Sequence, residues 1–151
     1  MQTSENGVKA IIAFEGMELC AYRCPAGVWT IGVGHTGNVD GKPIVKGLQI
    51  THGKAMELLR SDLAKIEKFI DEQPFANKLT QGQFDALVSF VFNVGTAAFR
   101  TSTLCRKLCS CAATAAEEFD RWVYGTVNGK KEKLPGLVAR RKRERELFEA
   151  G

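Results

Sequence analysis

Residues 14–37, FEGMELCAYRCPAGVWTIGVGHTG, bring together several side chains that could do chemistry. Glu15 is followed after eight residues by Cys24, and Thr30 follows Cys24 after five more. A carboxylic acid can deliver a proton, and a thiol or a hydroxyl can hold or activate water. From the residue types alone, this stretch is either a catalytic site or a loosely specified hairpin.

Glu15 comes at the end of the first helix that the sequence predicts, over about residues 4–14, with Gly16 as its stop. At the C-terminal end of a helix the dipole disfavours a negative charge, so the protonated carboxyl is favoured. A carboxyl in that form can act as a general acid. A solvated glutamate at a helix end is the alternative interpretation.

Cys24 supplies a thiol rather than a carboxylate. A free thiol has a pKa of about 8.5, so only a small part of it is thiolate at neutral pH. We expect the negative charge of nearby Glu15 to raise the pKa of Cys24 further. The sequence therefore predicts that Cys24 is not a strong base at rest, and a half-buried turn cysteine remains the alternative.

The totals describe an ordinary globular chain. It has 151 residues, of which 44% are hydrophobic and 25% charged, with a formal net charge of +4. This length fits one domain, and no apolar run approaches the ~18 residues of a membrane helix. The first residues lack the order of a signal peptide, so we expect neither membrane insertion nor export by this segment. The modest positive charge is compatible with an anionic polymer as partner.

The cysteines favour a reducing compartment, because their number is five and at least one cannot pair within the chain. Cys105, Cys109 and Cys111 lie close together in the sequence, but no histidine or second cysteine pair has zinc spacing near them. We therefore predict buried helix cysteines and no metal site.

The hydrophobic pattern predicts a single α+β domain that is mostly α. Short β-prone pieces separated by turn signals form a small, strongly turned sheet within about residues 15–50. A long helix over about 51–72 connects this β-lobe to a helical lobe over about 73–151, on which residues 4–14 pack. A groove between two such lobes is the natural place for a ligand.

Four further helices are expected in the helical lobe. A central buried helix follows a capping box at Thr80–Gln83, and a short helix covers about 103–111. A second capping box at Thr114–Glu117 opens the third helix, and the last begins at Leu134–Pro135. The basic run within this last helix, residues 140–145, is predicted to be a solvated face rather than a nucleic-acid surface.

Read with its spacing, the set Glu15, Cys24 and Thr30, followed by the strand TIGVGH, closely resembles the phage-type lysozymes, the endolysins of glycoside hydrolase family 24. The resemblance continues in residues 86–95, which are similar to the buried central helix of that family. Residues 134–147 are similar to its C-terminal helix. The resemblance covers essentially the whole chain and implies a lysozyme-like fold.

The resemblance implies a role for each residue of the set. Glu15 would be the general acid that gives its proton to the leaving oxygen, and Thr30 would hold the attacking water on the opposite face, with inversion. Cys24 stands where the commoner residue of the family is Asp, although Cys also occurs there in active members. Its role stays open between a base on demand, a water-positioning group and a nucleophile.

Three other positions take roles from the resemblance. His35 matches a histidine whose role is structural, and Asp62 on the long helix is its expected ion-pair partner. Phe99 matches a position that lines the sugar groove, and a core aromatic residue is the alternative.

The function that the resemblance implies is that of an endolysin, a lysozyme. It hydrolyses the β-1,4 bond between N-acetylmuramic acid and N-acetylglucosamine in peptidoglycan, for host cell lysis. It would need no metal or organic cofactor, bind peptidoglycan and no nucleic acid, and act as a monomer. It would accumulate in the host bacterial cytoplasm until a holin-type pore releases it to the wall.

Several alternatives remain open. A lytic transglycosylase cleaves the same bond without added water, and a protein impaired by Cys24 could bind peptidoglycan without cleaving it. A nucleic-acid binder on the basic last helix is a further alternative. A disulfide between Cys24 and another cysteine, such as Cys20, would hold the enzyme inactive until thiol exchange releases it.

Overall fold

The computed structural model describes all 151 residues, which form two compact units. The β unit comprises residues 11–65, and the helical unit comprises residues 1–10 together with 66–151. The prediction of a mostly helical α+β chain with a small N-terminal β part is confirmed. None of the helices combines the length and the apolar composition that crossing a lipid bilayer requires.

Two helices contribute to both units. They are α1 (Glu5–Glu15) and α2 (His52–Asp71). The β unit also holds strands β1 (Glu18–Arg23) and β2 (Trp29–Gly32). The remaining elements belong to the helical unit: η1 (Ala76–Lys78), α3 (Gln81–Val94), α4 (Thr96–Arg100), α5 (Thr103–Ser110), η2 (Ala112–Thr114), η3 (Ala116–Arg121), β3 (Tyr124–Val127), β4 (Lys130–Lys133) and α6 (Pro135–Ala150).

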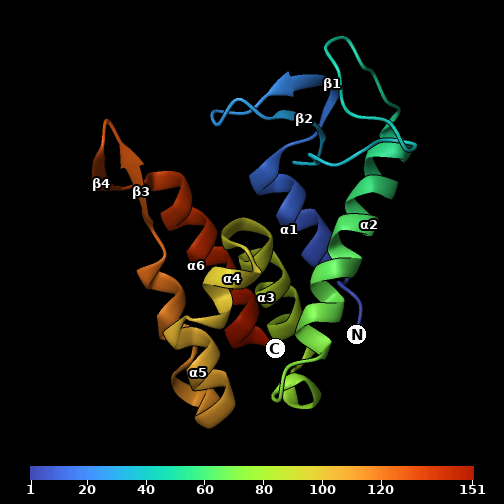
Figure 1. Cartoon of the computed structure of the whole chain (residues 1–151). Helices are drawn as coiled ribbons and strands as arrows, with labels where there is room; N and C mark the ends of the chain where they lie inside the picture. Colours follow the sequence, from blue (N-terminus) through green and yellow to red (C-terminus); the bar gives the residue numbers. More distant parts are fainter. The chain divides into compact units, whose positions relative to one another are not determined.

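The β unit is built on an antiparallel hairpin of β1 and β2 (Figure 1). A bulge interrupts the pairing between Glu18 and Tyr22, beyond which Tyr22 pairs with Thr30 and Arg23 with Trp29. The small core of this unit consists of Ile31, Val39 and Ile44, packed against Ala21, Trp29, Leu48, Ile50 and Leu58. The hairpin and the loops that follow it therefore pack on the same small apolar core.

The helical unit is organised around α3, which is buried along most of its length and packs against α6. Its apolar residues Leu87, Val88 and Phe90 are fully buried. Apolar residues on more than one side of a helix are typical of a helix in the centre of a core. The capping box predicted at Thr80 is present, with the Thr80 hydroxyl accepting from the Gln83 N–H.

Phe99 belongs to this core and not to a groove. Its exposed fraction is 0%, and its ring lies edge-on to those of Phe69, Phe75 and Phe90, with centroids 6.0 to 6.3 Å apart. A side chain enclosed by other rings cannot contact a sugar. The groove-lining role suggested for Phe99 is therefore corrected to the core alternative.

The basic run of α6 is only partly a solvated face. Arg140, Arg141 and Glu144 are buried, with exposed fractions of 5%, 1% and 0%. Glu144 Oε1 accepts from Arg140 Nε at 3.2 Å and from Ser89 Oγ at 2.7 Å, and its Oε2 lies 3.1 Å from Arg141 Nε. Buried charges require such partners because they have lost their water. The expectation of a solvated face is wrong for these three residues.

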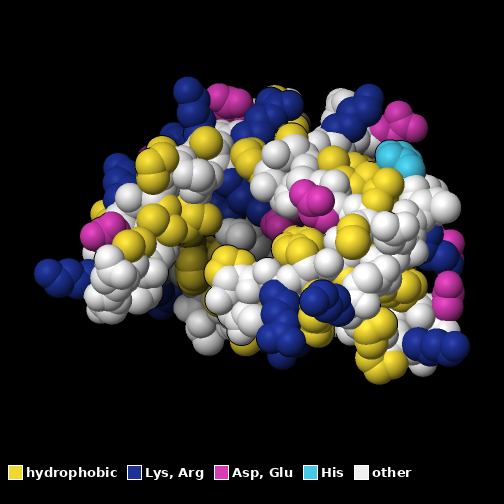
Figure 2. All heavy atoms as spheres, turned by 90° about the horizontal axis from the view of Figure 1, so that it is seen from above, with side chains coloured by type: hydrophobic (Ala, Val, Ile, Leu, Met, Phe, Trp, Pro, Cys, Tyr) yellow, Lys and Arg dark blue, Asp and Glu magenta, His cyan; other side chains and the backbone are white.

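Of the remaining cations of the run, Lys142 and Arg143 are exposed and Arg145 is half-buried, and the protein surface shows no single basic face in the view drawn. Lys142 and Arg143 are exposed residues of α6. In Figure 2 the Lys and Arg side chains lie in several separate groups, with Asp and Glu side chains between some of them.

The α-helix predicted from Thr114 is instead the short 3-10 helix η3 (Ala116–Arg121), and a hairpin follows it. Thr114 ends η2, and the cap of η3 is Ala115, which has no side-chain hydrogen bond. Strands β3 and β4 then pair antiparallel around Asn128 and Gly129, whose φ values are 51° and 76°. Positive φ at both positions is the geometry of a type I′ turn, for which Asn-Gly is the preferred pair.

Of the two capping boxes expected from the sequence, only the one at Thr80 is formed, so the two threonines should contribute differently to stability. Thr80→Ala removes the acceptor of the Gln83 N–H and should lower the free energy of unfolding by about 1 kcal/mol. Thr114→Ala removes an exposed hydroxyl that donates to the Cys111 carbonyl at 3.3 Å and should cost clearly less. Urea unfolding followed by circular dichroism measures both, and equal losses would contradict the assignment.

Candidate active site

Glu15 is the last residue of α1, as the sequence predicts. Gly16 follows with φ 73°, a conformation that L side chains rarely adopt, and its N–H donates to the Ile12 carbonyl at 2.8 Å. This is a glycine stop of the kind that ends many helices. The glycine turns the chain into β1, and the half-buried Glu15 carboxyl is left at the negative end of the helix dipole.

Cys24 opens the tight turn between β1 and β2. Its N–H donates to the Val28 carbonyl at 2.9 Å, and its carbonyl accepts from the Gly27 N–H at 2.8 Å. The backbone N–H groups of Val28 and Ala26 and the side chain of Thr30 lie near the Cys24 sulfur. Hydrogen bonding by the Val28 backbone first, and then by Ala26 and Thr30, lowers the pKa of the Cys24 thiol from its ordinary value, against an opposing effect of desolvation that is smaller than that of Val28.

The expectation that Glu15 raises the pKa of Cys24 is therefore wrong. Donors aimed at the sulfur stabilise the thiolate and favour the charged form. The effect of the Val28 backbone is the largest of those that act on the pKa of Cys24. At neutral pH the turn gives Cys24 more thiolate than a free cysteine would have.

Thr30 lies on β2 beside Cys24 and is buried, with an exposed fraction of 3%. Its hydroxyl donates to the Val28 carbonyl at 2.9 Å and also interacts with the Cys24 sulfur. A hydroxyl has one proton and two lone pairs, so it serves one acceptor at a time and can still accept from water. The structure thus places Thr30 near Cys24.

Tyr22 is a neighbour of this group that the sequence analysis did not select. It is the cross-strand partner of Thr30, and it precedes Cys24 by two residues. The alternation of side chains along a strand places residues two apart on the same face. That period-2 relation was the signal available in the sequence.

His35 is held by two oxygen acceptors. Its Nδ1 lies 2.7 Å from Asp62 Oδ2, and its Nε2 lies 3.0 Å from the Asn38 carbonyl. Gly32 and Gly34, with φ 66° and 65°, make the tight turn that lets Ile31 and His35 exchange both backbone hydrogen bonds. Because both ring nitrogens are engaged, the ring is placed to hold this loop to α2 and not to act on a ligand.

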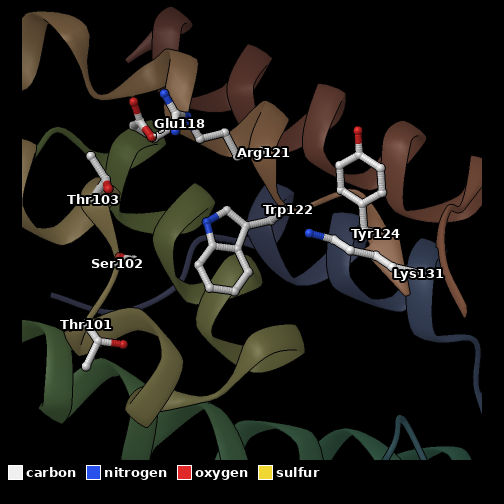
Figure 3. A pocket seen from close by; sticks show the side chains of 8 residues that line it. All are labelled: Thr101, Ser102, Thr103, Glu118, Arg121, Trp122, Tyr124 and Lys131. Atoms are coloured by element: carbon white, nitrogen blue, oxygen red, sulfur yellow. Dashed lines mark ion pairs between the residues drawn. The ribbon is translucent and has the colours of Figure 1, made fainter. Parts of the chain in front are cut away.

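The helical unit contains a cavity of about 440 Å³. It is lined by Thr101, Ser102, Thr103, Glu118, Arg121, Trp122, Tyr124 and Lys131 (Figure 3). The buried Glu118 carboxylate is ion-paired to Lys107 at 2.6 Å and to Arg121 at 3.0 Å. None of the residues selected from the sequence lines this cavity, so it is distinct from the group around Cys24.

The cysteines are all free thiols, and no group of three or more His, Cys, Asp or Glu side chains is arranged to hold a metal ion. Burial raises the pKa of the half-buried Cys105, and the neighbouring Cys109 adds to this shift. Cys109 and Cys111 are exposed, so the expectation of buried helix cysteines is wrong for these two. The reason for Cys111 is that α5 ends at Ser110.

Comparison with known proteins places this geometry in a family. Residues 12–144 match the family described as Phage lysozyme. The endolysin of Acyrthosiphon pisum secondary endosymbiont phage 1 is 44% identical over 151 residues, covering 99% of each chain. The endolysin of Salmonella phage P22 is 42% identical over 149 residues, covering 98% of each.

The fold is also similar to solved structures. The muramidase domain of SpmX from Asticaccaulis excentricus superposes with a TM-score of 0.84 at 38% identity, covering 97% of each chain. This similarity confirms the lysozyme-like fold expected from the sequence.

A structural role for the His35–Asp62 pair predicts an effect on stability. Asp62→Asn should lower the free energy of unfolding by about 2 kcal/mol, because a mostly buried, charged hydrogen bond is replaced by a neutral one. The matched control is Asp40→Asn, since Asp40 is an exposed partner of Lys54 at 2.8 Å and should matter far less. Chemical denaturation measures both. A folded Asp62→Asn protein of unchanged stability would contradict the structural role.

Proposed function

Since this chain belongs to the phage lysozyme family, we propose that it is a phage endolysin, a muramidase that hydrolyses the β-1,4 bond between N-acetylmuramic acid and N-acetylglucosamine in peptidoglycan. The observation that carries the proposal is the placement of Cys24 and Thr30 in the one hairpin that directly follows the helix end at Glu15. An acid on one side and a held water on the other is what glycoside hydrolysis requires.

The proposed reaction is a single displacement. Glu15 starts protonated and gives its proton to the glycosidic oxygen as the bond from that oxygen to the muramic acid carbon breaks. A water molecule that donates a hydrogen bond to the Thr30 hydroxyl attacks the same carbon from the opposite face. The proton that this water loses passes to the Cys24 thiolate. The sugar is released with inverted configuration, and neither a metal nor an organic cofactor takes part.

The lowered pKa of Cys24 favours the role of base among the three that the sequence left open. A thiolate supported by N–H groups can take a proton from water, and it does so without a carboxylate at this position. The Cys24 thiolate also favours hydrolysis over lytic transglycosylation. Transglycosylation adds no water, so it needs no base to take a proton from water. The family and the thiolate together also disfavour a binding protein without activity.

The proposal extends to the setting of the reaction. Peptidoglycan is the partner, nucleic acid is not, and the enzyme acts as a monomer. It would accumulate in the host cytoplasm and reach the wall through a holin-type pore. Expression in a bacterial host with and without such a pore would separate this route from self-export.

The general acid is tested by Glu15→Gln, which keeps the shape of the side chain but cannot donate the proton. Wall-lysis activity, followed as loss of turbidity of a peptidoglycan suspension, should fall by about 10² to 10⁴. The control is Glu5→Gln at the other end of α1, which should retain activity. Products with reducing muramic acid ends indicate hydrolysis, and 1,6-anhydro ends would replace the proposal with transglycosylation.

The thiolate is tested by the pH dependence of alkylation. Because the fold favours deprotonation of Cys24, its reaction with iodoacetamide should reach half its maximum rate at a lower pH than the reaction of a cysteine in an unstructured peptide. Thr30→Val removes a donor to the sulfur, so it should move this midpoint to higher pH. Thr36→Val, at an exposed loop position, should not move it.

Mass spectrometry of the labelled peptide supplies the measurement. A midpoint that is equal to that of a free cysteine, or that Thr30→Val leaves in place, would count against the thiolate. In the lysis assay, Cys24→Asp should keep activity and Cys24→Ser should lose it, since only the first can carry the charge.

A further inference from the structure

One face of the β1–β2 hairpin holds more than the two residues already assigned to the reaction. Tyr22 and Thr30 are direct cross-strand partners, and such partners present their side chains on the same face. The next pair, Arg23 and Trp29, occupies the opposite face, where the guanidinium lies 4.9 Å over the indole ring. Tyr22 therefore shares the face of Thr30.

Cys24 completes the same face. It follows Tyr22 by two residues, its N–H continues the strand pairing by donating to the Val28 carbonyl, and its sulfur contacts the Thr30 hydroxyl. Three side chains able to donate or accept a proton are thus adjacent: the phenol of Tyr22, the hydroxyl of Thr30 and the thiol of Cys24.

The phenol of Tyr22 lies among acidic groups. Partial burial raises its pKa, and the negative charges of Glu18, Glu15 and Cys24 raise it further, in that order. The hydroxyl has no hydrogen-bond partner in the structure, and Tyr22 is half-buried. Tyr22 is therefore a neutral donor at neutral pH, close enough to both proposed proton-transfer groups for their charges to act on it.

We propose that Tyr22 is a positioning residue of the reaction, whose phenolic O–H stabilises the negative charge as it moves from Cys24 to Glu15; this rests on the proposed function. Before bond cleavage the charge is on the thiolate. After cleavage the thiol is neutral and Glu15 is a carboxylate. No proton leaves Tyr22, and no covalent bond to its oxygen is made or broken; its O–H is the donor to the group that carries the negative charge.

The physical reason for such a donor is the crowding of charge. When Glu15 has given up its proton, its carboxylate joins that of Glu18 near the same phenol. A neutral donor between like charges lowers their repulsion, whereas a phenylalanine ring would only exclude water from them. The thiolate already receives donors from the turn, so the contribution of Tyr22 should fall mainly on Glu15.

The proposal is tested by Tyr22→Phe, which removes the hydroxyl and keeps the ring. The value of kcat should fall by about tenfold to a hundredfold, as for the loss of one hydrogen bond to a charged group, while KM stays within about twofold. Tyr124→Phe is the matched control, because Tyr124 is the other tyrosine of the chain and lies in the helical unit. A Tyr22→Phe enzyme with unchanged kcat would overturn the proposal.

A spectroscopic titration separates this role from a purely structural one. In the Tyr124→Phe background the ultraviolet absorbance of phenolate reports Tyr22 alone, because the chain has two tyrosines. Adding Cys24→Ser or Glu15→Gln removes a nearby negative charge, so each should lower the pKa of Tyr22. A titration that neither substitution moves would show that the phenol does not face these groups, and the proposal would fail.

The two proposals fail differently. If Glu15→Gln retains wall lysis, the function proposed for the chain is wrong whatever Tyr22 does. If Glu15→Gln abolishes lysis and Tyr22→Phe leaves kcat intact, only the role of Tyr22 is wrong.

Discussion

The turn between β1 and β2 is the constraint on which the site depends. A single short loop closes the hairpin through the Cys24 N–H and the Val28 carbonyl, and in doing so it turns the N–H groups of Val28 and Ala26 toward the sulfur. The same closure sets the register that puts Tyr22 opposite Thr30. Backbone geometry thus determines both the charge on the thiol and the identity of its neighbours.

The rest of the β unit maintains this hairpin. Ile31, directly after Thr30, is completely buried and anchors β2 in the small core. The glycines on either side of Val33 then return the chain so that His35 pairs with Ile31 and reaches Asp62. Strand β2 is thus fixed both at Ile31 and at the turn that leads to His35. The Thr30 hydroxyl, which directly precedes Ile31, has little freedom to move. Such rigidity is what a site needs if its donors are to be in place before the substrate arrives.

Much of the fold could be predicted because its signals are local. The glycine after Glu15, the capping box at Thr80 and the proline at the start of α6 each act within one helical turn, and each ends or begins a helix where expected. The Asn128–Gly129 pair is an equally local signal for a hairpin, and the two strands that flank it had no counterpart among the predicted elements.

Other properties depend on groups that are distant in sequence. The burial of Arg140, Arg141 and Glu144 follows from the packing of α6 against α3, and a run of charged residues gives no sign of it. The pKa of Cys24 moved opposite to expectation, because the sequence shows the nearby carboxylate but not the direction of the backbone N–H groups. The relation of Glu15 to a groove between lobes stays a prediction.

The hydrogen bonds that stabilise the Cys24 thiolate also have a chemical cost. A thiolate that is accessible and supported by donors is the form that peroxides attack, giving first a sulfenic acid and then irreversible higher oxides. Aspartate, the commoner residue at this position in the family that the chain resembles, undergoes no such reaction. Under the proposed mechanism, oxidation of Cys24 would therefore end activity, and the rate of inactivation would rise with the oxidant concentration around the protein.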